Sequence, residues 1–321
     1  MLAVTCASQS VEDPLSGLAV GERPAPELPG GWVRVSMRAA ALNHHDLWSL
    51  KGVGLPAERL PMVLGCDGAG VLDDGTEVVV HAVVPSPGWQ GDETLDPRRT
   101  LLSELYDGTL AEQVVVPAAN VLPKPPELSW EDAACLPTAW LTAYRMLFTN
   151  AGVRPGQTVL VQGAGGGVAT AAIALGRAAG LTVWATSRDE GKRARALEIG
   201  AHEVFDSGAR LPGKVDAVME TVGKATWAHS LRALRPGGAL VVSGATSGPD
   251  PSADLNRVFF LQLKVIGSTM GNREELRDLL QLCANTGLRP VIDDVRPLAD
   301  ARASFERLAA GDVFGKLVLT V

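Results

Sequence analysis

The stretch Thr158-Val-Leu-Val-Gln-Gly-Ala-Gly-Gly-Gly-Val-Ala-Thr170 decides the fold of this chain. Its opening residues are mostly apolar or β-branched and predict a buried strand, and the residues after the glycines predict a helix over 168–179. A strand that stops in glycines and becomes a helix presents unpaired backbone N–H groups, and the helix dipole favours an anion there. The predicted phosphate-binding turn consists of Gly163, Ala164, Gly165, Gly166, Gly167 and Val168.

The spacing Ala164-x-Gly166-x-x-Ala169 fits a dinucleotide fingerprint in which the first and last glycines are alanine. Alanine suits the last position, where the helix must pack closely on the strand. Alanine at the first position departs from the pattern, although Gly163 and Gly165 flank it and can supply the tight turn. The motif alone is a weak signal, because glycine-rich turns of this kind also occur in α/β proteins that bind no nucleotide.

The residues after the next predicted strand, 181–186, indicate which nucleotide is bound. That strand ends about twenty residues after the glycines, where such folds place the residue that contacts the adenosine ribose. An acid there would bind the hydroxyls of NAD, but this chain has Ser187 and Arg188, followed by Lys192 and Arg193. Cations and a hydroxyl suit a ribose 2′-phosphate, so the sequence favours NADP(H). The two acids that follow Arg188 keep NAD open, but they fit better as the N-cap and first-turn acid of a helix over 190–199.

Composition describes an enzyme-sized globular protein. The 321 residues are 46% hydrophobic and 20% charged, which is enough apolar material for two domains. A net charge of −7 argues against a nucleic-acid partner, and no apolar run is long enough to cross a membrane. The N-terminus lacks the pattern of a secretion signal, and the 4 cysteines form no C-x-x-C pair. We therefore expect a cytoplasmic protein with reduced thiols.

The pattern of the chain changes near residue 123. Before it, β-branched runs at 31–37, 68–72, 77–84 and 110–116 predict antiparallel strands of a barrel-like or sandwich domain. After it, predicted strands at 158–162, 181–186, 203–205, 215–220, 239–244 and 265–269 alternate with helices at 129–134, 138–150, 168–179, 190–199 and 224–234. That alternation predicts an α/β fold, a doubly wound parallel sheet of the Rossmann type. A helix at 273–287, a segment at 291–297, a helix at 299–310 and a strand at 317–321 indicate a return to the first domain. The expected domains are 1–122 with 272–321, and 123–271.

Six motifs in fixed order carry a resemblance to a known family. They are Leu64-Gly-Cys-Asp-Gly-Ala-Gly70 and the segments 40–48, 108–117, 136–144, 153–161 and 315–320. With them the chain resembles the medium-chain dehydrogenase/reductase superfamily, specifically its zinc-free quinone oxidoreductase-like (zeta-crystallin-like) members. The resemblance implies a GroES-like catalytic domain, completed by the C-terminus, and a Rossmann nucleotide-binding domain, with the active site in the cleft between them.

Zinc decides which chemistry is open to the protein. Zinc-dependent relatives hold their catalytic zinc at positions that the resemblance places on Asn43, Cys66, Asp67 and Thr138. One thiol and one carboxyl beside an amide and a hydroxyl make a poor zinc site. The segment 85–107, where relatives carry a structural-zinc lobe, contains no cysteine. We expect no metal; the alternative is an unusual site that combines Cys66 and Asp67 with His44, His45 or His81.

Without a Lewis acid, hydride addition to an activated C=C bond or to a quinone is easier than polarising an alcohol oxygen. The developing enolate needs a hydrogen-bond donor and then a proton. The resemblance suggests Asn43 as the amide donor and His45 as the proton donor or relay, with Asp46 orienting an imidazole or capping the following turn. A polar loop that bonds to its own backbone is the other interpretation of 43–46. Many quinone reductases have Tyr where this chain has Trp48, so a tyrosine-based mechanism is not expected.

The remaining site residues follow from the resemblance and the fold. The expected substrate pocket consists of Trp48, Cys66, Asp67, Thr138 and Trp140, although Cys66 also fits as a small buried filler. We expect His44 at the cofactor pyrophosphate, Thr142 beside the nicotinamide, and Ser187, Arg188 and Lys192 at the 2′-phosphate. Further cofactor contacts are expected at the strand ends, from Thr221, Val222, Ser243, Gly244, Ala245, Ser268, Thr269 and Met270.

The sequence thus predicts an oxidoreductase acting on a small molecule, without nucleic-acid or membrane partners. A homodimer is expected through the edge strand 265–269, which is apolar, free of proline and an aggregation hazard if left bare. Two other classes stay open: a zinc-type alcohol dehydrogenase with atypical ligands, and a nucleotide-binding RNA-binding or regulatory relative without turnover.

Overall fold

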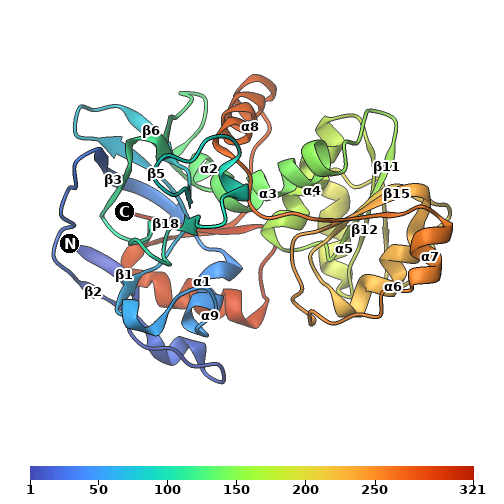
Figure 1. Cartoon of the computed structure of the whole chain (residues 1–321), viewed down its shortest axis with the longest axis horizontal. Coiled ribbons are helices and arrows are strands. Elements are labelled where there is room, and N and C mark those ends of the chain that lie inside the picture. The colour runs from blue at the N-terminus through green and yellow to red at the C-terminus, as the bar shows by residue number, and fades with distance from the viewer. The chain divides into compact units, whose positions relative to one another are not determined.

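The computed structural model describes residues 1–321 and divides into two compact units, Met1–Leu141 with Met270–Val321, and Thr142–Thr269 (Figure 1). Residues 123–141, which the sequence assigns to the nucleotide-binding domain, lie with the first unit. The reason is that helix α2 (Trp130–Ala134) packs against strands β3 (Trp32–Ala41) and β5 (Asp67–Leu72) of that unit. No helix is both long enough and apolar enough to span a bilayer.

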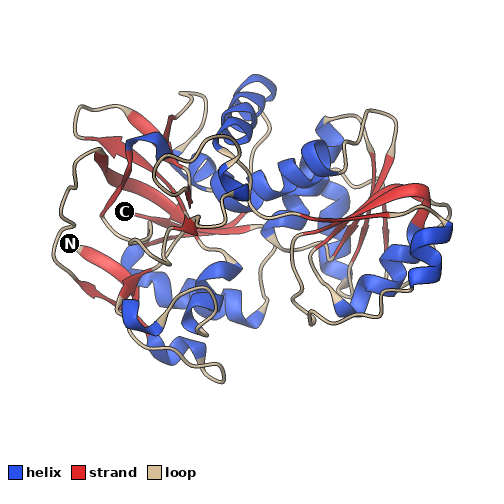
Figure 2. Cartoon of the chain, viewed as in Figure 1, coloured by secondary structure: helices blue, strands red, loops and turns tan.

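The second unit is built on one six-stranded parallel sheet. Its order is β13-β12-β11-β14-β15-β16, and the sheet is doubly wound, as the sequence predicts. Figure 2 shows helices beside its strands. The strands are β11 (Thr158–Gln162), β12 (Thr182–Thr186), β13 (Glu203–Phe205), β14 (Val215–Glu220), β15 (Leu234–Val242) and β16 (Lys264–Gly267). The helices are α4 (Gly167–Ala178), α5 (Glu190–Glu198), α6 (Lys224–Ala233) and α7 (Leu255–Phe260).

Small residues let α4 lie close to this sheet. Ala169 and Gly176 are buried, and a Cβ added at Gly176 would come within 2.9 Å of Val183 on β12. Leu160 and Val218, on neighbouring strands, belong to one buried apolar cluster. The sheet order changes direction between β11 and β14, and ligands of such sheets bind at the carboxyl ends of the strands at this point.

The first unit contains a mostly antiparallel seven-stranded sheet. Its order is β10-β6-β5-β3-β18-β17, with β9 also paired to β3. The members besides β3 and β5 are β6 (Glu77–Val80), β9 (Gln113–Pro117), β10 (Val121–Pro123), β17 (Ile292–Pro297) and β18 (Lys316–Thr320). The predicted return of the C-terminus is present, since β18 pairs antiparallel with β3.

Shorter elements complete this unit. β1 (Leu2–Cys6), β2 (Leu18–Glu22) and β4 (Met62–Val63) form a small sheet, and β7 (Val83–Val84) pairs with β8 (Thr100–Leu101). The helices besides α2 are α1 (His44–Leu50), α8 (Arg273–Thr286) and α9 (Ala301–Ala310).

The helix predicted at 138–150 is a succession of turns, π-helical at Leu136–Trp140 and Arg145–Asn150 around α3 (Leu141–Tyr144). The strand predicted at 77–84 is divided into β6 and β7, because Asn120 bonds to the backbone of His81 and Val83.

Candidate active site

The polar loop 43–46 forms the N-terminus of α1. Asn43 is the N-cap, and Asp46 completes a capping box by accepting from the Asn43 backbone N–H at 2.8 Å. The other carboxylate oxygen of Asp46 accepts from the Gly65 N–H at 2.9 Å. Of the two roles expected for Asp46, the structure has the capping one.

A lysine that the sequence did not single out lies at the centre of this site. Lys316, at the start of β18, is buried, and its Nζ donates to the Leu42 carbonyl at 2.7 Å, to Asn43 Oδ1 at 2.7 Å and to Asp67 Oδ2 at 2.8 Å. An ammonium group has three N–H bonds, so these contacts saturate it. Lys316 and Asp67 therefore form a buried ion pair.

The same contacts occupy the side chain of Asn43. Its Oδ1 accepts from Lys316, and its Nδ2 donates to Asp67 Oδ2 at 2.9 Å and to the Ala41 carbonyl at 3.4 Å. Contrary to the role expected from the sequence, this geometry gives Asn43 no free N–H for a substrate oxygen. Asn43 instead links Lys316 to Asp67.

The residues at the zinc positions of the relatives do not fit a zinc ion. Asp67 is bound to Lys316, and the Cys66 thiol donates to the Leu102 carbonyl at 3.2 Å. Burial, and next the negative charge of Asp46, raise the pKa of Cys66 well above its ordinary value. No group of three or more His, Cys, Asp or Glu side chains in the chain is arranged to hold a metal. The alternative set with His44, His45 or His81 is not brought together.

The two neighbouring histidines differ in their surroundings. His44 is exposed, and desolvation by the surrounding protein, followed by the charge of Lys316, lowers its pKa, which favours a neutral imidazole. His45 is mostly buried, and its Nε2 has no hydrogen-bond partner. The Glu104 carboxylate, which no sequence motif indicates, lies 3.9 Å from that nitrogen. Its other oxygen accepts from the Leu101 N–H at 2.9 Å, which fixes the carboxylate beside the ring.

The predicted substrate-pocket residues divide into accessible and buried ones. Trp48 is 38% exposed, as a pocket wall requires. Cys66, Asp67 and Trp140 are fully buried, so they support the site from behind rather than line an open pocket. Thr138 is partly buried, and its hydroxyl has no partner. Met270, expected at the cofactor, packs with Cys66 in the first unit.

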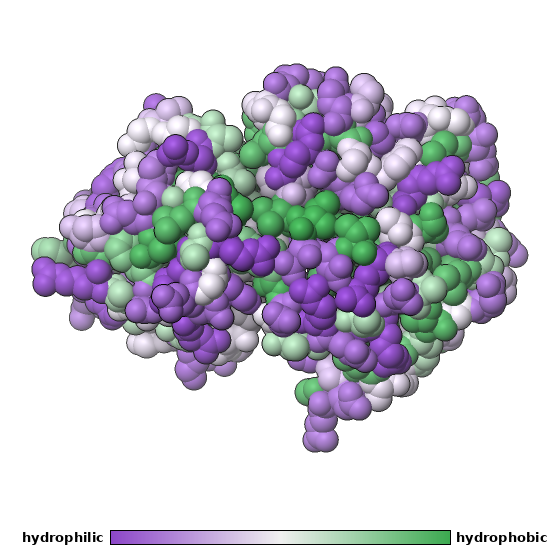
Figure 3. Space-filling model, turned by 180° about the vertical axis from the view of Figure 1, so that it is seen from behind, coloured by the Kyte–Doolittle hydropathy of each residue, from purple (hydrophilic) through white to green (hydrophobic).

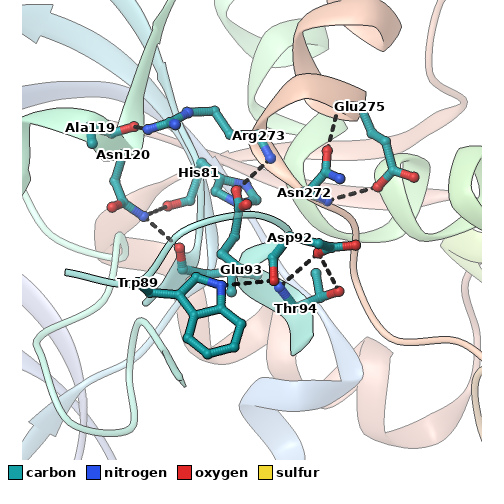
Figure 4. Close-up of polar contacts among 11 residues, drawn as sticks. His81, Trp89, Asp92, Glu93, Thr94, Ala119, Asn120, Asn272, Arg273 and Glu275 are labelled. Atoms are coloured by element: carbon teal, nitrogen blue, oxygen red, sulfur yellow. Dashed lines mark hydrogen bonds and ion pairs between the residues drawn. The ribbon is translucent and has the colours of Figure 1, made fainter. Parts of the chain in front are cut away.

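Carboxylates hold the lobe 85–107, in which the relatives would bind a structural zinc. Glu93 lies between the His81 ring, 3.2 Å from Nε2, and the Arg273 backbone N–H at 2.6 Å, the first residue of α8 (Figure 4). Asp96 accepts from the Ser86 N–H at 2.6 Å and the Arg98 N–H at 2.8 Å. These carboxylate contacts hold the lobe, and the His81 ring lies beside Glu93.

The glycine turn of the second unit offers fewer N–H groups than predicted. Those of Gly163 and Ala164 both donate to the Thr186 carbonyl, at 3.1 and 2.8 Å. α4 begins at Gly167 without a side-chain cap, so the N–H groups of its first turn have no partner in the helix. A Cβ built at Gly166 would meet open space. The N–H groups better placed to bind an anion are therefore those of Gly165, Gly166, Gly167 and Val168.

Gly163 is required for steric reasons, and Gly165 lies beside a cation. Gly163 has φ +80°, and a Cβ there would approach Val222 to 2.8 Å. A Cβ at Gly165 would approach the Lys192 side chain to 2.8 Å. The stem of Lys192 therefore lies against the glycine turn, as a phosphate-binding residue should.

The cations predicted beyond β12 have different environments. Arg188 is exposed, and Ser187 is buried with its hydroxyl accepting from the Asp189 N–H. Arg193 bonds to Asp206 and to the Ser187 carbonyl, which makes it a structural residue of this loop. Arg188 and Lys192 remain the candidates for a 2′-phosphate.

The other predicted cofactor residues mostly lie at strand ends of the second unit. Val222 follows β14, and its N–H donates to the Glu220 carboxylate at 2.8 Å. The Ser243 and Ser268 N–H groups donate to the Glu220 and Val242 carbonyls, which extends the sheet pairing past the strands. Thr221, Gly244 and Ala245 lie in the adjoining loops, Thr269 is exposed, and Thr142 is buried on α3.

Comparisons with known proteins agree with this architecture. Family models described as "Alcohol dehydrogenase GroES-like domain" and "Zinc-binding dehydrogenase" match residues 29–126 and 167–285. An alcohol dehydrogenase from Geobacillus stearothermophilus is 30% identical, covering 95% of this chain and 96% of that protein. An acryloyl-coenzyme A reductase from Metallosphaera sedula is also 30% identical, with 95% and 96% covered.

Two solved structures extend the comparison. A crystal structure of an NAD-dependent alcohol dehydrogenase matches with a TM-score of 0.93 and 36% identity, covering 100% of both chains. The 2-octenoyl-CoA carboxylase reductase CinF, in complex with NADP and 2-octenoyl-CoA, matches with a TM-score of 0.90 and 26% identity, covering 99% of this chain and 87% of that one.

A Rossmann unit with an open glycine turn, joined to a β-sheet unit with a buried polar site, defines a two-domain oxidoreductase. The relatives make the assignment specific. The chain belongs to the medium-chain dehydrogenase/reductase superfamily.

Proposed function

We propose that this protein is an NADP(H)-dependent reductase that adds a hydride to an activated C=C bond, of the enone or enoyl-thioester kind, or to a quinone, without zinc. The observation that carries the proposal is the Lys316 ammonium held by Asn43 and Asp67. Two residues at the zinc positions of the relatives are bound to this internal cation, and a third, Cys66, is a protonated thiol bonded to a carbonyl. Chemistry that needs little oxygen polarisation suits such a site.

The cofactor choice rests on Arg188 and Lys192. Arg188 is exposed beyond β12, and Lys192 lies against Gly165. Two cations are therefore available beside the glycine turn for a 2′-phosphate. The first turn of α4 would receive the pyrophosphate, and bound NADPH would supply the hydride. CinF, a relative crystallised with NADP and an enoyl-CoA, supports this choice. The NAD-dependent relative makes NADH the necessary comparison.

We assign proton donation to His45. Its ring is partly accessible, and the carboxylates of Glu104 and Asp46 lie near it. Hydride addition places two electrons in the substrate as an enolate or hydroquinone anion, and the proton from His45 neutralises that charge. Solvent then returns the proton to the ring. Asp67 and Lys316 hold the loop 43–46 that carries His45.

A screen of NADPH oxidation tests the proposal. Crotonyl-CoA, 2-octenoyl-CoA, a simple enone and a benzoquinone are offered with NADPH or NADH, and alcohols are offered with NADP⁺ or NAD⁺. We expect turnover of at least one C=C or quinone substrate, unchanged after dialysis against a chelator, and a large loss of kcat in His45→Asn. Alcohol oxidation that a chelator abolishes and zinc restores would instead identify a zinc-type alcohol dehydrogenase.

We further propose that the protein is a homodimer through β16. This strand is at the edge of the parallel sheet, and its neighbour α7 exposes large apolar side chains. Leu255, Phe259 and Phe260 are 71%, 67% and 79% exposed, and Val265 on β16 is 47% exposed. The space-filling view shows apolar residues exposed among polar ones on the face that it presents (Figure 3). A bare edge strand beside such a patch favours self-pairing.

A further inference from the structure

The second unit contains a buried polar chain that the proposed reaction does not use. It connects side chains at the carboxyl ends of β11, β12 and β14 with α6. Thr186 Oγ1 donates to Gln162 Oε1 at 2.6 Å, and Gln162 Nε2 bonds to Ser230 Oγ and His229 Nδ1, each at 2.9 Å. Ser230 Oγ then donates to Glu220 Oε2 at 2.6 Å. Each of these side chains is less than a tenth exposed.

Its hydrogen bonds allow one assignment of protons. His229 Nε2 lies 2.9 Å from the Ala209 carbonyl, which only accepts, so Nε2 carries the hydrogen and Nδ1 accepts from the Gln162 amide. Gln162 donates its two N–H groups to His229 and Ser230, and its side-chain oxygen accepts from Thr186. The Ser230 hydroxyl, receiving from Gln162, must donate to Glu220. A chain with every donor and acceptor matched is rigid, because no side chain can turn over without losing a buried bond.

Both ends of this chain hold loops of the nucleotide site. At one end, the Thr186 carbonyl accepts the N–H groups of Gly163 and Ala164, which fixes the start of the glycine turn. At the other end, Glu220 Oε1 accepts from the Val222 N–H at 2.8 Å and the Gly223 N–H at 3.0 Å. Gly223 has φ +90°, so the carboxylate holds a backbone conformation that other residues rarely adopt.

We propose that Gln162, His229, Ser230 and Glu220 are positioning residues for the nucleotide, holding the glycine turn and the loop 221–223 in the spacing that the cofactor requires. None of them needs to contact the cofactor. They set its affinity by keeping two separate loops preorganised, so that binding does not have to order them. The inference rests on the proposed nucleotide-binding function.

Two conservative variants test it. Gln162→Met keeps the length of the side chain and removes its amide, and Ser230→Ala removes one hydroxyl. We expect each to raise the Kd and KM for NADPH about tenfold, with kcat changed by less than about twofold, because the loss is in binding rather than chemistry. Binding is measured directly by calorimetry, with thermal melting and circular dichroism as checks on folding.

The same sheet supplies a matched control at its opposite end. Asp216, at the amino end of β14, accepts from the Thr158 N–H at 2.8 Å and from Gln157 and Arg235. Asp216→Asn should lower the melting temperature yet leave the Kd for NADPH unchanged. If Asp216→Asn weakens binding as much as Ser230→Ala does, the effect is general loosening and the inference is wrong. It is also wrong if both chain variants stay folded and bind normally. Wild-type protein that binds neither NADPH nor NADH would refute the proposed function instead.

The pH dependence of NADPH affinity provides a second test. Desolvation lowers the pKa of His229, and Arg232 lowers it further, while its bond to Ala209 and the charge of Glu220 act in the other direction. Protonation of His229 at Nδ1 would place its new N–H against the N–H of the Gln162 amide, and the hydrogen bond between them would be lost. The polar chain is therefore intact above the ordinary pKa range of histidine and breaks as pH falls through the lowered pKa of His229 in the folded protein. His229→Asn keeps an acceptor for Gln162 and removes the titration. Between pH 7.5 and 5 we expect NADPH affinity to fall more steeply in the wild type than in His229→Asn; equal slopes would contradict this role of His229.

Discussion

Replacing Lys316 by methionine should destabilise the protein strongly. Methionine has nearly the same length but no charge, so Asp67 is left as a fully buried carboxylate whose remaining donor is the Asn43 amide. Breaking a buried ion pair by removing one partner costs about 3–5 kcal/mol. With a denaturant slope of about 3 kcal/mol per molar urea, the unfolding midpoint should fall by roughly 1–1.7 M.

A second substitution separates the ion pair from lost packing. Adding Asp67→Asn to the Lys316→Met background removes the stranded charge and should recover about 2 kcal/mol, although each change alone destabilises. Lys224→Met, at an exposed lysine, serves as the control and should stay within about 0.5 kcal/mol of the wild type. A stabilising ion pair is ruled out if Lys316→Met costs less than about 1 kcal/mol, or if Asp67→Asn makes the variant still less stable.

Four further outcomes can be checked. Arg188→Ala should raise the KM for NADPH about tenfold and leave NADH nearly unchanged, since one charge-assisted pair is lost; equal losses with both cofactors would make Arg188 structural. Elemental analysis of purified protein should find well under one zinc per chain, and a chelator should change neither the melting temperature nor reductase activity; stoichiometric zinc needed for activity would overturn the mechanism. Ile266→Lys should convert a dimer into monomer or insoluble protein in light scattering, and a monomeric wild type would exclude the β16 interface. Burial raises the pKa values of Glu93 and Asp96, but hydrogen bonds outweigh it and hold both folded pKa values below their ordinary ones; Glu93 lies beside His81 and accepts from the Arg273 N–H, and Asp96 accepts from the Ser86 and Arg98 N–H groups. Their stabilisation of the lobe 85–107 is therefore present at neutral pH and lost as pH falls below about 4. Amide exchange in the lobe should accelerate at that pH in the wild type and already at neutral pH in Glu93→Gln; exchange that neither change affects would refute the carboxylate anchoring.

Local pattern was enough to predict the parallel sheet. The strands at 158–162, 203–205 and 215–220 have the predicted bounds, because buried β-branched runs between turn residues carry a strong signal. α7 was missed, since Leu255–Phe260 is one short helix whose aromatic residues are exposed and give no core-facing periodicity. The six motifs of the resemblance identified the superfamily, which the pattern of the sheet could not do.

Partners distant in the sequence could not be predicted. In the sequence, Lys316 is a single cation in an apolar strand. Its bond to Asp67 joins residues 249 positions apart, so no local pattern indicates it. The use of the Gly163 and Ala164 N–H groups by the Thr186 carbonyl depends on where β12 ends beside β11. Glu104 became a candidate only because its loop brings it to His45. In each case the missing information is a tertiary contact rather than a residue type.

The place of Lys316 on the last strand sets an order for assembly of the protein during synthesis. Residues 142–269 are contiguous and make a complete parallel sheet before the C-terminal segment leaves the ribosome. The first unit, in contrast, lacks β17 and β18 until residues 292–320 have been synthesised, and Asp67 stays without its cation until then. The parallel sheet of the second unit can therefore form before the sheet of the first unit is complete. A message truncated before codon 316 would encode every strand of the parallel sheet but neither β18 nor the cation that pairs with Asp67.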